Sequence, residues 1–208
     1  DISPSMNFKS HLSQTTKRDR ALVLTFALGE LLVHAGERIA LLGLTMPSSS
    51  RKTTSRIAEL LAANATNPIN AASLPPQARL SRFSSTVLFS DFLDPPDKIL
   101  GRLDEMAASG VSGTLVQVLD PAEETLPYDG RTEFVGLEGT DRWIADRAET
   151  IRDAYAAKLA AHRALLTEHA RKLGWTFLVH HTDRPATEPL MSLIMRLQGL
   201  PVTAGGTS

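Results

Sequence analysis

The stretch STVLFSDFLDPPDKILGRLDEMAASGVSGTLVQVLD, residues 85–120, predicts a strand, a helix and a second strand in succession. Residues 85–90 and 113–120 are dominated by branched and aromatic apolar side chains, which is typical of strands covered on both faces. Residues 95–110 begin with proline, carry apolar side chains at helical spacing and end in glycine. Because parallel neighbours need a crossover connection, this unit predicts a parallel sheet.

The rest of the chain continues this alternation of helices and strands. Its patterns predict helices at residues 21–36, 53–63, 147–173 and 186–200, and strands at residues 38–44 and 175–180. A hairpin is expected at residues 132–145, with its turn at 138–141. The predicted fold class is therefore α/β, a doubly wound and mostly parallel Rossmann-type sheet flanked by helices, with an inserted β-hairpin. The length indicates one domain over residues 1–200 and a flexible tail over residues 201–208.

Charge and cysteine content exclude several classes of function. The 22 Lys and Arg residues against 23 Asp and Glu residues leave a net charge of -1, so no overall field favours nucleic acid or an anionic membrane. The chain has no cysteine, which excludes disulfides and suits a reducing compartment, and we expect a cytoplasmic protein. The apolar stretch 21–36 is shorter than the roughly 20 residues that span a bilayer and contains Glu30. It predicts a buried helix, and a basic cluster that includes Lys17 precedes it.

Two oxygen-rich phrases lie where strands of the predicted sheet end. DISPSM supplies Asp1, Ser3 and Ser5, and SDFLD places Asp91 directly after the predicted strand 85–90. Ligands of open α/β sheets bind outside the carboxyl ends of the strands, so we expect both phrases at one edge. Carboxylate and hydroxyl oxygens suit Mg²⁺, which takes about six oxygens near 2.1 Å. Zinc fits poorly, because neither phrase contains a thiolate or a histidine.

DISPSM resembles the D-x-S-x-S motif of von Willebrand factor A-like domains. In that family the first aspartate and both serines help to form a metal-ion-dependent adhesion site, which implies Asp1, Ser3 and Ser5 as ligands. Another aspartate on a third loop of the family is matched by Asp91. A middle loop of the family supplies a threonine ligand, and the residues of TMPSSSRKTTS that could match it are Thr45, Ser50, Thr53 and Thr54. Among these alternatives, Thr54 is the candidate that we adopt.

The phrases SDFLD, VQVLDPAEETLPYDG, IRDAYAAKLAAHRALL and TDRP resemble, in this order, a bacterial domain-of-unknown-function branch of the A-like proteins. Members of this branch are often encoded beside MoxR-type AAA+ ATPases. The resemblance implies a non-enzymatic protein-binding module in which Mg²⁺, or alternatively Mn²⁺ or Ca²⁺, leaves one coordination position for a partner's carboxylate. The implied partner is a MoxR-type ATPase or its client, in assembly or maturation. A strand and a further segment before Asp1 are also implied, so we expect the chain to be part of a longer protein.

Two alternative functions stay open. If Asp1, Ser3 and Ser5 only cap the following helix, the chain is a metal-free interaction scaffold. If Asp1 or Asp91 is catalytic, the chain is a metal-dependent hydrolase. Asp1 resembles the nucleophile of haloacid dehalogenases, but Ser3 replaces the second carboxylate that this chemistry needs. No G-x-S-x-G elbow and no P-loop lysine motif occurs, and we expect no enzyme activity.

Other acidic and histidine residues have simpler interpretations. Glu123 and Glu124 lie in a polar loop predicted at residues 121–130, where solvated side chains are expected. His180 and His181 are neighbours on a predicted strand and point to opposite faces, so they cannot easily bind one ion. We expect structural roles for both histidines.

Overall fold

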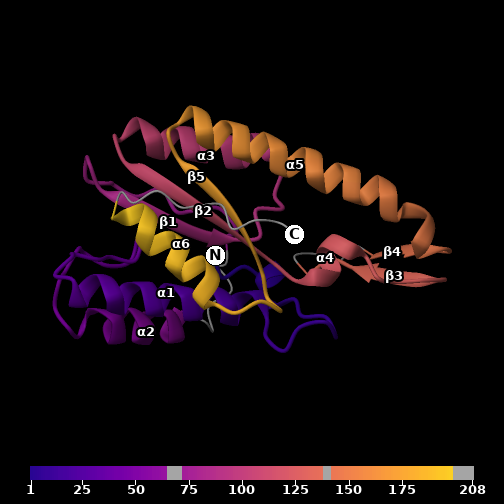
Figure 1. The fold of residues 1–208 in the computed structure, drawn as a ribbon, viewed down its shortest axis with the longest axis horizontal. Coiled ribbons are helices and arrows are strands. Elements are labelled where there is room, and N and C mark those ends of the chain that lie inside the picture. The colour runs from indigo at the N-terminus through magenta and orange to yellow at the C-terminus, as the bar shows by residue number, and fades with distance from the viewer. Residues whose placement is uncertain (65–71, 138–141, 199–208) are drawn as a thin grey trace.

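A computed structural model of the chain describes residues 1–64, 72–137 and 142–198. Its centre is a parallel sheet of three strands in the order β1 (Ser85–Ser90), β2 (Ser112–Leu119) and β5 (Thr176–His181). β1 and β5 both pair in parallel with β2, which confirms the crossover topology predicted from residues 85–120. Helices cover both faces of the sheet (Figure 1), so the predicted α/β, doubly wound fold class is confirmed.

The central strand β2 explains why the core has two halves. Every residue from Gly113 to Leu119 is buried, and successive side chains point to opposite faces. Leu115 packs in one apolar cluster with side chains of α3 (Pro96–Ala108) and α5 (Arg152–Lys172). Val116 and Val118 belong to the other cluster. The helices on that face are α1 (Lys17–His34) and α6 (Thr187–Leu197), as Figure 1 shows.

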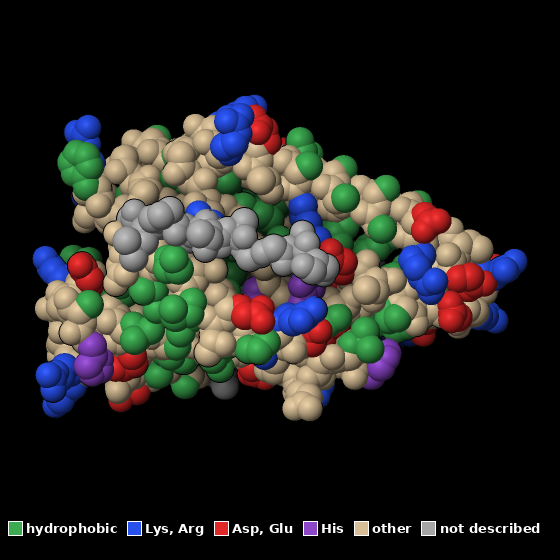
Figure 2. Space-filling view, viewed as in Figure 1, with side chains coloured by type: hydrophobic (Ala, Val, Ile, Leu, Met, Phe, Trp, Pro, Cys, Tyr) green, Lys and Arg blue, Asp and Glu red, His purple; other side chains and the backbone are tan. Residues whose placement is uncertain are grey.

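The predicted hairpin is present at one end of the molecule (Figure 1). It consists of β3 (Thr132–Val135) and β4 (Arg142–Ala145), which pair antiparallel. Phe134 stacks on Trp143 across the pair, with ring centroids 5.5 Å apart. The predicted turn at 138–141 lies outside the described residues. Figure 2 shows charged side chains of both signs at this end and hydrophobic side chains over α1 and α6.

The strand predicted at residues 38–44 is wrong. Only an isolated antiparallel bridge joins Ile39 to Ser48, and the chain between them turns back on itself. Gly43 has φ +75°, and the Leu41 carbonyl accepts from the nitrogens of both Leu44 and Thr45 at 3.0 Å. Local hydrogen bonds therefore replace those of a sheet neighbour. The apolar run forms a turn in which Ile39, Leu41 and Leu42 are partly buried.

A short helix replaces the start of the loop predicted at residues 121–130. This helix, α4 (Pro121–Thr125), begins with a capping box in which Asp120 and Glu123 bind each other's backbone nitrogens. The long helix α5 begins at Arg152, later than the predicted residue 147, after a 3-10 turn. The prediction of one domain stays a prediction, and its tail at 201–208 lies outside the described residues. Among the described residues, no helix is long and apolar enough to cross a membrane.

Candidate functional site

The two oxygen-rich phrases meet at the carboxyl end of β1. Ser90 Oγ donates to Asp1 Oδ2 at 2.6 Å, and the Ser3 backbone nitrogen donates to Asp1 Oδ1 at 2.8 Å. The Asp1 nitrogen donates to the Phe89 carbonyl at 2.9 Å. Asp91, which follows Ser90, is therefore adjacent to the DISPSM segment. The predicted meeting of segments about 90 residues apart is confirmed by these contacts.

Ser3 and Ser5 present two hydroxyl oxygens to each other. Their Oγ atoms lie 3.0 Å apart, and Ser3 is fully buried. Two neighbouring oxygens in an octahedral Mg²⁺ shell with ligands near 2.1 Å are also about 3 Å apart. The serine pair therefore has the spacing of two adjacent ligands. The 3-10 turn η1 (Pro4–Asn7) holds this segment, and Ser3 makes no side-chain cap to it, so the capping interpretation of Ser3 is wrong.

Asp91 is bound to a lysine that the sequence analysis did not place at the site. Lys17 Nζ lies 2.9 Å from Asp91 Oδ2 and 2.6 Å from Glu123 Oε1. The Lys17 and Asp91 side chains are 1% and 2% exposed, and that of Glu123 is 15% exposed. The expectation of a solvated Glu123 is therefore wrong, because α4 turns it toward Lys17. Burial raises the pKa of Glu123, although the Lys17 ammonium acts in the opposite direction.

The turn that carries Asp91 is conformationally unusual. Phe92 has φ +49°, which is rare for a residue with a Cβ atom. Its nitrogen donates to Ser90 Oγ at 3.1 Å, and its carbonyl bonds to His162 Nε2 at 2.6 Å. The Phe92 side chain is buried, so packing and hydrogen bonds together hold the backbone in this state. Backbone strain of this kind concentrates at functional sites.

Asp120 anchors the neighbouring strand end. It is fully buried, follows β2 and accepts from the Ser10 nitrogen at 2.8 Å and from Ser10 Oγ at 2.5 Å. The Ala122 nitrogen also donates to it at 2.9 Å. The N-terminal segment is therefore hydrogen-bonded to the carboxyl edge of the sheet in two places, at Ser90 through Asp1 and at Asp120 through Ser10.

A second polar cluster lies beside the first, on the α5 side. Arg163 Nε donates to Gln117 Oε1 at 2.9 Å, and Arg163 also pairs with Glu124, which in turn bonds to His181. The hydrogen bond from Arg163 lowers the pKa of Glu124. Burial and the Glu123 charge raise the pKa of nearby Tyr155 to about 12. Glu124 is thus tied into the structure, unlike the solvated residue that we expected.

Thr54, the predicted middle-loop ligand, lies elsewhere. It belongs to α2 (Thr53–Asn64) and packs against Gly29 of α1, where an added Cβ atom would lie 3.8 Å from its hydroxyl. Gly29 is twelve residues beyond Lys17 in the same helix, which is about 18 Å along the axis. The structure therefore brings Asp1, Ser3, Ser5 and Asp91 together but leaves Thr54 about three helical turns away.

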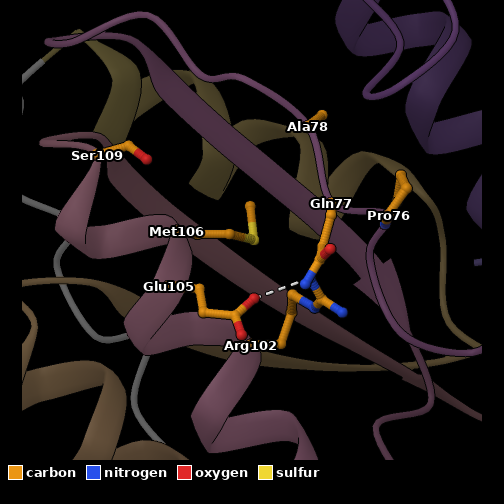
Figure 3. Close-up of a pocket in the computed structure, with 7 residues that line it drawn as sticks. All are labelled: Pro76, Gln77, Ala78, Arg102, Glu105, Met106 and Ser109. Atoms are coloured by element: carbon orange, nitrogen blue, oxygen red, sulfur yellow. Dashed lines mark hydrogen bonds and ion pairs between the residues drawn. The ribbon is translucent and has the colours of Figure 1, made fainter.

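Two surface cavities are both smaller than a typical small-molecule site. One cavity has a volume of about 80 Å³. Figure 3 shows the residues that line it, from residues 76–78 and α3, with the ion pair of Arg102 and Glu105 among them. This volume holds two or three waters, and it lies near Ser109, at the opposite edge of the sheet from Asp91. An open groove of about 210 Å³ lies between β5 and α6, lined in part by His180. Small-molecule sites are larger, typically about 300 Å³ or more.

Sequence reasoning missed Lys17, Glu123 and Asp120. The spacing from Asp120 to Glu123 matches a capping box and could have predicted α4 together with a carboxylate near the strand end. The sequence contains only a weak indication that Lys17 has a special role, namely its position at the start of a helix. A lysine is unfavourable at the first position of a helix, because the macrodipole is positive there.

A protein family described as "Protein of unknown function DUF58" matches residues 1–165. The chain belongs to this family. The DUF58 match includes the DISPSM segment, Lys17, Asp91 and Glu123, and it ends before β5 and α6. No curated protein and no solved structure matches the sequence significantly. Membership of this family therefore does not identify an activity.

The predicted metal ligands divide into two groups by their surroundings. Ser3 and Ser5 have a suitable spacing and lie beside Asp1, whereas Asp91 is paired with Lys17. Within the described part of the chain, no three His, Cys, Asp or Glu side chains gather so as to hold a metal ion. Metal binding stays a prediction, and it depends on hydroxyl oxygens.

Proposed function

We propose that this DUF58 chain is a non-enzymatic protein-binding module that recognises a partner's carboxylate at the carboxyl edge of its sheet. The observation that carries the proposal is the meeting of Asp1, Ser3 and Ser5 with the turn at Ser90 and Asp91. Polar groups from distant segments converge there, at the edge where open α/β sheets bind ligands. The strained Phe92 backbone supports the same location.

The resemblance of DISPSM to von Willebrand factor A-like domains suggests how the carboxylate is bound. Ser3 and Ser5, together with Asp1, would hold a divalent cation, and Mg²⁺ suits these hard oxygens best. Mn²⁺ and Ca²⁺ are alternatives. Such an ion would supply an open coordination position to the partner's Glu or Asp side chain. The neighbouring Asp1 carboxylate is fixed by Ser90 and by the Ser3 nitrogen, so the DISPSM segment keeps its shape.

The proposed partner is a MoxR-type AAA+ ATPase or its client, in assembly or maturation. Only the family resemblance of the phrases between SDFLD and TDRP supports this identity. A cysteine-free chain suits the cytoplasm, where such an ATPase would be met.

Calorimetric titration with Mg²⁺ and Mn²⁺ tests the ion. We expect a single binding event for the wild type and none for Ser3→Ala/Ser5→Ala, because this double variant removes both hydroxyl ligands. Ser55→Ala is the matched control, since Ser55 is exposed on α2. Equal heats for the wild type and the double variant would refute the serine site.

A binding assay with a purified MoxR-type ATPase tests the partner. We expect the wild type to bind in Mg²⁺ and to lose binding in EDTA or after Ser3→Ala/Ser5→Ala. A wild type that does not bind the ATPase in Mg²⁺ would contradict this partner, even if the calorimetry shows an ion.

A metal-free interaction module is a second candidate, and the Lys17 contacts favour it. Lys17 already pairs with the Asp91 and Glu123 carboxylates at the edge, so these two groups are held in place without a metal ion. Partner binding that persists unchanged in EDTA would support this function over the metal-dependent one.

A further inference from the structure

The Lys17 ammonium group is held by protein groups on several sides. Two carboxylates bind it, one from Asp91 at the end of β1 and one from Glu123 in α4. The Phe8 ring lies nearby, with its centroid 5.8 Å from Nζ. An aromatic face attracts a cation, so the surroundings of this ammonium group resemble those of a bound ion.

The position of Lys17 is costly for the chain. The side chain is 1% exposed, and removal of an ammonium group from water is unfavourable without compensating contacts. Lys17 is also the first residue of α1, where the helix dipole disfavours a positive charge. Neither burial nor helix formation favours a lysine here. The carboxylates of Asp91 and Glu123 are the groups that stabilise the lysine at this position.

Each oxygen of the two carboxylates already accepts a hydrogen bond. Lys17 occupies one oxygen of each, while the second oxygens accept from the Leu93 nitrogen at 3.3 Å and from the Asp120 nitrogen at 2.9 Å. A divalent ion could take Asp91 or Glu123 as a ligand only by displacing the ammonium group.

We infer that Lys17 is the resident cation of this edge, and that its ammonium group neutralises Asp91 and Glu123 and denies both carboxylates to divalent ions. Asp91 is then a partner of Lys17, and a metal at the edge is limited to the serine pair. Removal of the lysine charge converts the Asp91 and Glu123 pair into a divalent-cation site. This inference does not depend on the proposed function, because it concerns carboxylates and not the serines.

The test uses a Ser3→Ala/Ser5→Ala background, so that the serine site cannot respond. Thermal unfolding is measured in EDTA and in Mn²⁺ with and without the further change Lys17→Met, which keeps an unbranched side chain one atom shorter and removes the charge. We expect Mn²⁺ to leave the background unchanged and to raise the midpoint of the Lys17→Met variant by about 5 °C. Asp91→Asn added to that variant should abolish the rise. No rise in the Lys17→Met variant, or an equal rise in the background, would overturn the inference.

A second measurement covers the case in which Lys17→Met does not fold. Reductive methylation of the wild-type protein reports the accessibility of each lysine amine. We expect Lys17 to react at least about tenfold more slowly than the exposed Lys9, both in EDTA and in Mn²⁺. Acceleration of Lys17 by Mn²⁺ would show that the ion displaces the ammonium group, and would overturn the inference without affecting the serine site.

Discussion

The Trp175 indole covers Gly113 so closely that a Cβ atom added to Gly113 would lie 2.0 Å from the ring. Gly113 lies near the start of the central strand β2, and Trp175 immediately precedes β5. The indole nitrogen donates to the Val111 carbonyl at 3.2 Å, which fixes the ring above the glycine. A rigid aromatic ring and a central strand cannot both move aside at low cost.

Gly113→Ala should therefore destabilise the fold by about 3 kcal/mol or more, because the new methyl group overlaps the Trp175 ring. Denaturant unfolding measures this change in the free energy of unfolding. Gly101→Ala is the matched control: Gly101 lies inside α3 with no atom near an added Cβ, so about 0.5–1 kcal/mol of stabilisation is expected. A Gly113→Ala protein as stable as the control would contradict the observed packing.

Lys17→Met should lower the free energy of unfolding by about 3–5 kcal/mol in EDTA, because Asp91 and Glu123 would be left buried without a counter-charge. Lys9→Met, an exposed lysine of the same segment, should change it by no more than about 0.5 kcal/mol. A double-mutant cycle with Glu123→Gln should show coupling between the two residues. Additive effects would mean that the Lys17 and Glu123 contact contributes nothing.

Ser10→Ala should cost about 1.5–3 kcal/mol, since it removes a hydrogen bond to the fully buried Asp120 carboxylate. Denaturant unfolding provides the measurement, and the exposed Ser55→Ala provides the control. A loss no greater than in the control would show that Asp120 is satisfied without the Ser10 hydroxyl.

His180 should make stability depend on pH. Burial and the nearby Arg20 charge lower the pKa of His180 from 6.5 to about 4, and its Nε2 atom has no hydrogen-bond partner among the described residues. Between these pH values the unfolded chain binds a proton that the folded chain does not. The contribution of His180 is therefore fully present above about pH 6.5 and is lost as the pH falls toward 4.

His180→Asn should remove this part of the pH dependence. The measurement is the difference in unfolding free energy between wild type and variant, followed from pH 7 to pH 4. His34→Asn, which changes an exposed histidine, is the control. A wild-type and a His180→Asn protein with parallel pH profiles would refute the role assigned to burial.

The edge of the sheet was predictable because it depends on local patterns. Acidic and hydroxyl residues directly after β1, and a similar phrase at Asp1, are visible in the sequence without any knowledge of the chain path. Hydrogen bonds from Asp1 to Phe89 and from Ser90 to Asp1 hold the two phrases together at the end of β1. The error at residues 38–44 has the converse reason, since an apolar run looks the same whether it pairs in a sheet or turns back at Gly43.

By itself, the sequence determined the alternation of strands and helices, the buried centre of β2 and the acidic phrase that follows β1, because hydrophobic periodicity reports local hydrogen bonding and burial. Only the tertiary structure decided that Lys17 meets Asp91, 74 residues away, and Glu123, 106 residues away. A charge at the start of a helix has the same local pattern whether water or two carboxylates surround it. Only the path of the folded chain brings Asp91 and Glu123 to the Lys17 ammonium group.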